Sequence, residues 1–170
     1  MSAKPLLANG DRSSGAICYD FRAFLHKGGA TLAPVRSRDD LARRKAGPIH
    51  VGRLPLVKAL HAVFIERQDS GVAPVTLGSF IVSIREFWNF CDVNEFRFSG
   101  LNLAPISRAT RSFVIALVHK FRTGKIQERT AGQSAWNVVG LIAEALEIKT
   151  GTLIGRTTMP RINPGSQAKA

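Results

Sequence analysis

Basic side chains recur at helical spacing between Ser107 and Gly124, in a pattern suited to contact with a polyanion. The positions concerned are Arg108, Arg111, His119 and Arg122. They fall opposite an apolar face of the same predicted helix, and Lys125 and Arg129 carry the positive charge beyond it. Lys and Arg side chains arranged in this way can neutralise the phosphates of a nucleic acid. For any one of these residues, an ordinary solvated surface is the alternative.

The segment that starts near Thr130 adds groups that can read base edges. Its predicted outward residues are Arg129, Thr130, Gln133 and Asn137. Guanidinium and amide groups bind base edges in the major groove, and a helix N-terminus favours phosphate. With two residues of an earlier helix, the predicted DNA-binding set is Arg85, Asn89, Arg108, Arg111, Arg122, Lys125, Arg129, Thr130, Gln133 and Asn137.

The sequence offers little that is typical of catalysis or of metal and cofactor binding. The acids are scattered, no glycine-rich loop follows a strand, and Gly-x-Ser-x-Gly is absent. The four histidines do not have the spacing of metal ligands. His119 and Arg122 form an H-x-x-R pattern, which a solvated basic face explains better. We therefore expect no catalytic residue, no metal, no cofactor and no small-molecule substrate.

Charge and composition indicate the class of partner. The 170 residues contain 24 Lys and Arg against 12 Asp and Glu, a net charge of +12, which favours nucleic acid or an anionic membrane surface. No window approaches the roughly 18 apolar residues of a membrane span, and no secretory leader is evident. Cys18 and Cys91 lie too far apart to suggest a disulfide framework or a metal site. We expect a soluble, cytoplasmic protein without a membrane partner.

The stretch from Val75 to Asp92 is the clearest structural element in the sequence. Its apolar residues at i, i+3, i+4 and i+7 spacing are Leu77, Phe80, Ile81, Ile84, Phe87, Trp88 and Cys91. Thr76 stands in front as a predicted N-cap. The pattern predicts a buried amphipathic helix whose outer side carries Ser79, Ser83, Arg85 and Asn89.

Three further helices are predicted, from about Leu54 to Asp69, from near Ser107 to Gly124, and from Thr130 to Gly151. Between the second and third helices, Asn94 to Pro105 is predicted to be an irregular connection. Its residues expected to pack on the core are Phe96, Phe98, Leu101 and Leu103. The fold class is therefore all-α, a compact four-helix domain over residues 51–151.

The two ends of the chain differ from this body. Residues 1–50 are rich in glycine, proline and charge and predict a loosely ordered basic arm, with one short helix from Ser37 to Lys45. This arm is either a polyanion contact or a solvated tail. Residues 152–170 are basic and contain prolines, so they predict a linker or tail.

Two runs in the predicted helices match a family pattern. The run Thr76-Leu77-x-x-Phe80-x-x-x-Ile84-Arg85-x-Phe87-x-x-Phe90-Cys91 resembles the N-terminal core-binding, SAM-like domain of tyrosine recombinases, the phage integrases. The run Arg129-Thr130-x-x-Gln133-x-x-Trp136-x-x-Val139 is similar to a later helix of that domain. The resemblance covers about Pro55 to Leu146. Phe80, Ile84 and Phe90 stand where the family usually has Tyr, Leu and Trp.

The resemblance implies a four-helix clamp over double-stranded DNA, with its second and fourth helices near the major groove. It implies DNA integration and recombination in a bacterial cell, at the nucleoid, beside recombinase protomers of the same kind. Strand exchange would belong to a separate catalytic domain. Tyr19 is the single tyrosine and lies in the arm, so it cannot be the family's nucleophile. Two alternatives stay open, a stand-alone helical DNA-binding regulator and a helical interaction module that does not bind nucleic acid.

Overall fold

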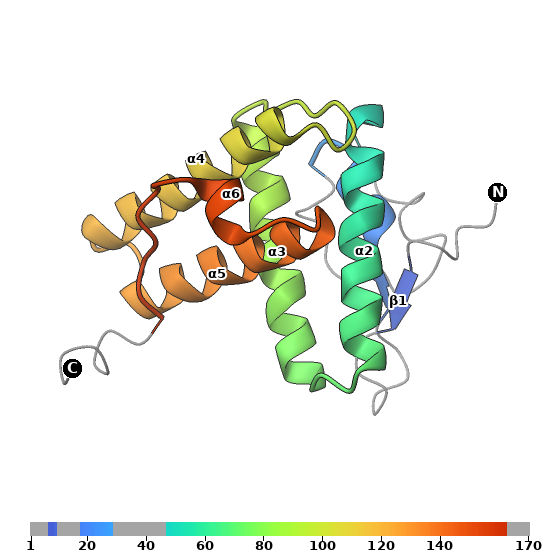
Figure 1. Ribbon diagram of the computed structural model, residues 1–170, viewed down its shortest axis with the longest axis horizontal. Helices are drawn as coiled ribbons and strands as arrows, with labels where there is room; N and C mark the ends of the chain where they lie inside the picture. The colour runs from blue at the N-terminus through green and yellow to red at the C-terminus, as the bar shows by residue number, and fades with distance from the viewer. Residues whose placement is uncertain (1–6, 10–17, 29–46, 163–170) are drawn as a thin grey trace.

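A computed structural model describes residues 7–9, 18–28 and 47–162 of the chain. Five α-helices make up most of the described part: α2 (Leu54–Asp69), α3 (Pro74–Val93), α4 (Leu103–Arg122), α5 (Glu128–Ala145) and α6 (Thr150–Ile154) (Figure 1). Ahead of them lie two short strands and two 3-10 helices: β1 (Leu7–Asn9), β2 (Cys18–Asp20), η2 (Phe21–Leu25) and η4 (Val51–Arg53). The described chain is mainly helical, which agrees with the predicted all-α class. None of its helices combines the length and the apolar character needed to cross a membrane.

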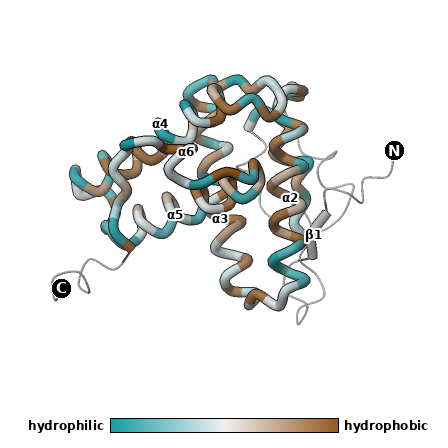
Figure 2. Tube along the Cα trace, in the orientation of Figure 1, coloured by the Kyte–Doolittle hydropathy of each residue, from teal (hydrophilic) through white to brown (hydrophobic). Residues whose placement is uncertain are grey.

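Helix α5 lies at the centre of the helical packing. It contacts α2, α3, α4 and α6, and Figure 2 shows hydrophobic and hydrophilic residues alternating along the helices that surround it. Its buried apolar residues are Ala131, Ala135, Val138, Val139, Leu141, Ile142 and Ala143. Because several of these side chains are small, neighbouring helices can approach α5 closely on more than one side. The orientation of α5 therefore depends on all the other long helices.

Helix α3 confirms the predicted buried face. Its buried apolar residues are Leu77, Ile81, Ile84, Phe87, Trp88 and Cys91, and Phe80 is half-buried. The predicted N-cap at Thr76 is wrong, because the cap residue is Ala73 and makes no side-chain hydrogen bond. Pro74 starts the helix two residues ahead of Thr76, since its fixed φ suits the first helical position and its missing N–H would have had no helical partner.

The boundaries of the other helices agree in part with the sequence. Helix α2 begins and ends as predicted, and α4 ends just before Gly124, whose φ is +77°. Helix α4 nevertheless starts at Leu103 rather than near Ser107, and α5 starts at Glu128 rather than at Thr130 and ends at Ala145, before Gly151.

The connection from α3 to α4 packs through its phenylalanines. Phe98 is buried edge-on against Trp88, with ring centroids 5.5 Å apart, and Phe96 is half-buried. Leu101 and Leu103 are 49% and 37% exposed, so the prediction that they pack on the core is wrong. A turn at Gly100, whose φ is +61°, directly precedes these two leucines.

Residues 152–162 pack against the helices, which corrects the prediction of a linker or tail for this part of the chain. Leu153 and Ile154 of α6 are buried, and Ser107 of α4 donates a hydrogen bond to the Leu153 carbonyl. Residues 155–162, called the strap below, then cross from α4 to α5 (Figure 1). Pro160 in the strap is buried.

The described parts of the predicted loose arm also join the fold. Strands β1 and β2 pair antiparallel, with Ala8 opposite Tyr19. Phe21 and Phe24 of η2 are buried, and the Phe21 ring lies 5.5 Å from that of Phe64 in α2. The arm therefore contributes Phe21 and Phe24 to the core. The predicted helix from Ser37 to Lys45 lies outside the described residues.

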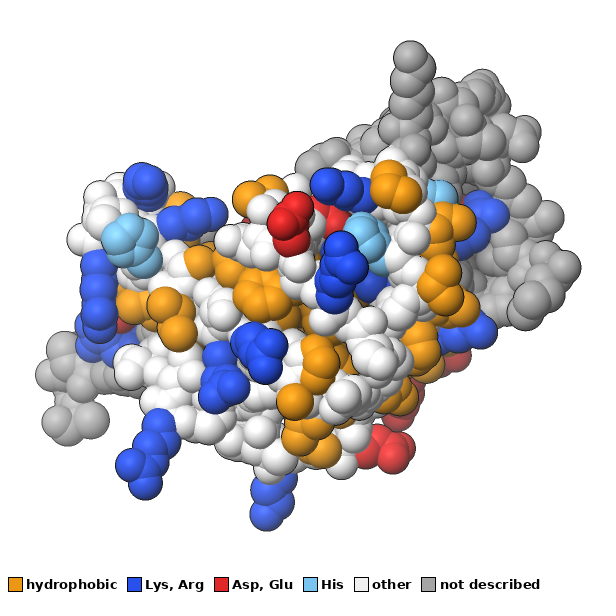
Figure 3. All heavy atoms as spheres, turned by 90° about the horizontal axis from the view of Figure 1, so that it is seen from above, with side chains coloured by type: hydrophobic (Ala, Val, Ile, Leu, Met, Phe, Trp, Pro, Cys, Tyr) orange, Lys and Arg blue, Asp and Glu red, His pale blue; other side chains and the backbone are white. Residues whose placement is uncertain are grey.

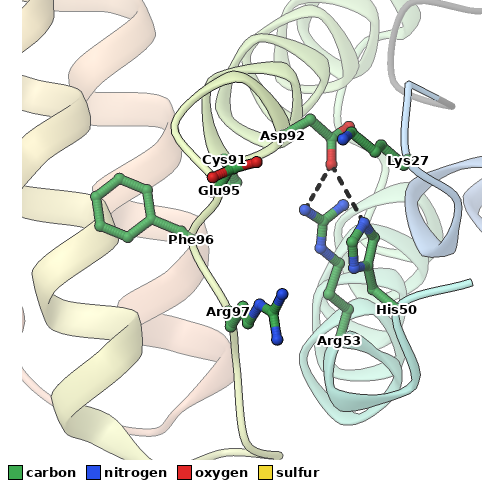
Figure 4. A pocket seen from close by; sticks show the side chains of 8 residues that line it. All are labelled: Lys27, His50, Arg53, Cys91, Asp92, Glu95, Phe96 and Arg97. Atoms are coloured by element: carbon green, nitrogen blue, oxygen red, sulfur yellow. Dashed lines mark hydrogen bonds and ion pairs between the residues drawn. The ribbon is translucent and has the colours of Figure 1, made fainter.

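A buried ion pair joins three segments at one end of α2 and α3. The Arg53 guanidinium donates to Asp92 Oδ1 at 2.6 Å (Figure 4). It also donates to the Phe24 carbonyl at 3.3 Å. Asp92 Oδ2 accepts from the backbone N–H of Gly28 at 3.0 Å. The guanidinium also lies over the Trp88 ring, 5.0 Å from its centroid. Both charged side chains are almost fully buried, so each depends on the other for compensation.

We predict that Asp92→Asn lowers the free energy of unfolding by about 3 kcal/mol, because it leaves the Arg53 charge buried without its counter-ion. Urea unfolding followed by circular dichroism measures the change. Asp69→Asn, at the exposed end of α2, is the control and should stay within about 0.5 kcal/mol of the parent. A double variant, Arg53→Met with Asp92→Leu, should be more stable than Asp92→Asn. Equal stability of Asp92→Asn and the parent would contradict this account.

Candidate nucleic-acid interface

Helix α4 presents a basic outer face. Its buried positions are Ile106, Ala109, Thr110, Phe113, Val114 and Leu117. This inward set leaves Arg108, Arg111, Ile115, His119 and Arg122 exposed, at the i, i+3, i+7, i+11 and i+14 positions of one outer stripe. The Thr110 hydroxyl donates to the Ile106 carbonyl at 2.8 Å, so the buried polar group on the inner side is satisfied.

The positive charge continues through the turn into α5. Lys125, Arg129 and Thr130 are exposed, and Figure 3 shows Lys and Arg side chains gathered at the left, where α4 passes into α5. Residues 103–130 contain six Lys and Arg but a single acid, Glu128. We call the exposed side chains of Arg108, Arg111, His119, Arg122, Lys125 and Arg129 the basic face.

Glu128 is engaged by the strap. The Arg161 Nε donates to Glu128 Oε1 at 3.0 Å, and a second guanidinium nitrogen donates to Oε2 at 3.2 Å. These hydrogen bonds and the charge of Arg161 hold the pKa of Glu128 below its ordinary value. The single carboxylate in this stretch is therefore ionised and paired, so its charge is offset locally.

Two of the predicted DNA-binding amides face another helix. Gln133 Nε2 donates to the Ser79 hydroxyl at 3.0 Å, and Asn137 Nδ2 donates to the hydroxyls of Ser79 and Ser83 at 3.1 Å each. Asn137 is half-buried and Ser83 is buried, so the prediction that they lie on an outer surface is wrong. Helical spacing correctly groups these residues on one side of each helix, but α3 and α5 turn those sides toward each other.

The remaining two predicted residues lie on α3. Arg85 is half-buried and Asn89 is exposed. Asn89 lines a groove of about 400 Å³ between α3 and α4, with Glu86 and Lys120 among its other polar residues. Arg85 is not among the residues that line this groove, and none of the side chains of the basic face lines it.

A second groove lies between α4 and the strap. It has a volume of about 370 Å³ and is lined by Ile115, Val118, His119, Arg122, Thr157 and Thr158. We call it the α4–strap groove. The sequence prediction missed the two threonines, and with them Arg156 and Arg161 of the strap. A signal was present in the apolar pair Leu153-Ile154, which would not be expected in a solvated tail.

The buried ion pair of Arg53 and Asp92 lies in a second polar cluster, apart from the basic face. A small pocket of about 80 Å³ is lined there by Lys27, His50, Arg53, Cys91, Asp92, Glu95, Phe96 and Arg97 (Figure 4). Burial raises the pKa of the Cys91 thiol, so it remains protonated and unreactive near neutral pH. Within the described residues, no group of three His, Cys, Asp or Glu side chains could hold a metal ion. The cluster is suited to holding segments together.

A comparison of the chain with models of protein families, with curated proteins and with solved structures finds no match. The resemblance to the core-binding domain of tyrosine recombinases rests on the residue patterns in α3 and α5, and it stays a prediction.

We predict that His50 makes stability fall as the pH drops below about 6.5. Burial, followed by the charge of Arg53, lowers the pKa of His50 from 6.5, with Lys27 and Arg97 acting in the same direction and Asp92 opposing them. Between the lowered pKa and 6.5, the unfolded chain binds a proton that the folded chain does not, so acid favours unfolding. Urea unfolding at pH 7.5 and pH 5 should show a smaller loss for His50→Gln than for the parent. An identical loss of stability in the two proteins would exclude His50 as a source of the pH dependence.

A matched pair of glycines in α5 tests the contact with the strap. A Cβ at Gly132 would overlap the carbonyl oxygen of Arg161, whereas a Cβ at Gly140 meets nothing within 4 Å. We expect Gly132→Ala to displace the strap and to destabilise the fold by about 1–3 kcal/mol through overpacking.

Gly140→Ala is the control, and it should stabilise the fold by up to about 1 kcal/mol because alanine favours the helix. The Trp136 indole N–H donates to the Pro160 carbonyl at 3.2 Å, so tryptophan emission should shift in Gly132→Ala alone. Similar stability and similar tryptophan emission for the two variants would contradict close packing of the strap against Gly132.

Proposed function

We propose that this protein binds double-stranded DNA through the basic face. The observation that carries the proposal is the stripe of exposed cations along α4 and the turn to α5, where the single acid is neutralised by Arg161. An exposed helix face of this kind can lie along a phosphate backbone, and each Arg or Lys that meets a phosphate releases condensed counter-ions. Binding of this kind weakens steeply as salt is added.

Contacts with base edges contribute less to the proposed DNA binding than the sequence predicts. Gln133 and Asn137 donate to serines of α3, so a base edge would have to displace those hydrogen bonds. Arg129 and Thr130, exposed in the first turn of α5, are the better candidates for contacts beyond the backbone. Phosphate contacts position a protein on DNA without specifying sequence. We therefore assign most of the affinity to charge.

We further propose that this binding serves a tyrosine recombinase, as the non-catalytic clamp of its core-binding domain. Support comes from the Thr76 to Cys91 pattern in α3, from the related pattern that starts at Arg129 in α5, and from the mainly helical fold. The partners would be duplex DNA and further recombinase protomers on it. A stand-alone helical regulator is the second candidate, favoured by the same basic face, and it would bind a palindromic site as a dimer.

We predict that replacing Arg108, Arg111 and Arg122 with Ala weakens duplex binding. The slope of log affinity against log salt should become shallower by up to about three, since each phosphate contact contributes about 0.9. Fluorescence anisotropy with a short labelled duplex at several salt concentrations measures affinity, slope and stoichiometry.

The charge-matched control replaces Lys27, Lys58 and Arg97, which are exposed and lie outside α4 and α5. This variant loses the same net charge, so it should show a clearly smaller change in slope. If the two triple variants weaken binding equally while both stay folded, then net charge acts without a defined face. No binding by the parent at low salt would refute the proposed function, and obligate dimer binding would favour the regulator.

A further inference from the structure

The α4–strap groove has a composition that phosphate binding alone does not require. Neutralising a phosphate backbone needs only cations, but this groove also presents two apolar side chains, Ile115 and Val118. Ile115 is 59% exposed in the middle of an otherwise charged stripe. An exposed apolar group inside a concave, positively charged site points to a ligand that is partly apolar and partly anionic.

The opposite wall supplies polar groups from the strap. Thr157 and Thr158 bring hydroxyls, each a donor and an acceptor, across from His119 and Arg122 of α4. The imidazole and guanidinium groups are planar, and both kinds of group stack on nucleobases. A nucleotide has the matching chemistry, since its base has apolar faces and polar edges and its phosphate is anionic.

Base pairing and stacking decide which nucleotide can enter. Inside a duplex both faces of each base are covered by its neighbours, and at a blunt end one face is still covered, so only an unpaired and unstacked base exposes both faces. The volume of about 370 Å³ lies near the lower end of the roughly 300–1,000 Å³ of small-ligand pockets, a size that suits a single nucleotide. The groove adjoins the basic face, because His119 and Arg122 belong to both.

We infer that the α4–strap groove accepts one unpaired nucleotide at the end of a DNA duplex bound to the basic face. This inference rests on the proposed function for the duplex part. It adds that a frayed or tailed duplex is the preferred partner, with the unpaired base between Ile115 and the strap threonines.

The test compares three labelled duplexes of the same paired sequence by fluorescence anisotropy at fixed salt. One is blunt, one carries a short single-stranded extension, and one carries an extension of abasic sites that has the same phosphates but no bases. For the parent protein, the extension with bases should tighten binding about tenfold relative to the abasic one, as expected for stacking of one base. The abasic duplex separates the contribution of the base from added charge.

Two variants address the groove. Ile115→Ala removes its exposed apolar side chain, and Thr158→Val removes a hydroxyl at nearly constant shape. Each should remove most of the gain from the extension while leaving blunt-duplex affinity unchanged. Val51→Ala, an exposed apolar residue of η4 outside the groove, is the matched control and should keep the gain in full.

The outcomes separate the two proposals. Binding of the blunt duplex with no difference between normal and abasic extensions would overturn the inference and leave the proposed function intact. Binding of none of the three would overturn both. A gain that survives in Ile115→Ala and Thr158→Val would show that the base lies elsewhere, which also overturns the assignment of the groove.

Discussion

The buried pair of Arg53 and Asp92 is the interaction on which the arrangement of the helices depends. It joins the start of α2 to the end of α3, and through Gly28 it also ties down the N-terminal segment. Two charges buried this deeply are compensated only while all their partners stay in place, so the pair tolerates very little displacement. The Trp88 ring beneath the guanidinium extends this constraint into the apolar core, where Phe87 and Phe98 pack against the indole.

The position of the basic face follows from the same packing. Helix α3, held at its end by Asp92, contacts α5, and α5 in turn contacts α4. The inner side of α4 is apolar and buried, so its outer side must be the one that carries the arginines. Electrostatics and packing thus support one another: burying the apolar stripe in the core sets the cations on one surface, and the strap covers the single carboxylate among them.

Much of the fold could be predicted from the sequence because helical periodicity is a local property. The buried face of α3 from Leu77 to Cys91, the bounds of α2 and the exposed cations of α4 all follow from residue spacing alone. Which polar side meets solvent is a tertiary property, and this is why Asn137 and Ser83 were misplaced: each lies on the predicted polar side, but another helix covers it. The strap and the η2 phenylalanines were missed for a related reason. Short segments rich in glycine, proline and charge show no periodicity, and their few apolar residues, such as Leu153 and Phe21, gain burial only once the helices offer them a surface.

The hydrogen bonds between α3 and α5 limit how far the two helices can slide along each other. Apolar side chains pack acceptably at several offsets, whereas a directional bond is satisfied at one. Asn137 uses one amide nitrogen to reach Ser79 and Ser83, which are a single helical turn apart. A slide by one turn, about 5.4 Å, would leave at least one of these partially buried polar groups without its partner. The Asn137 amide therefore fixes the register between α3 and α5. In the sequence this side chain resembles a base-reading group, but in the fold it selects one alignment of the two helices from several that hydrophobic packing would allow.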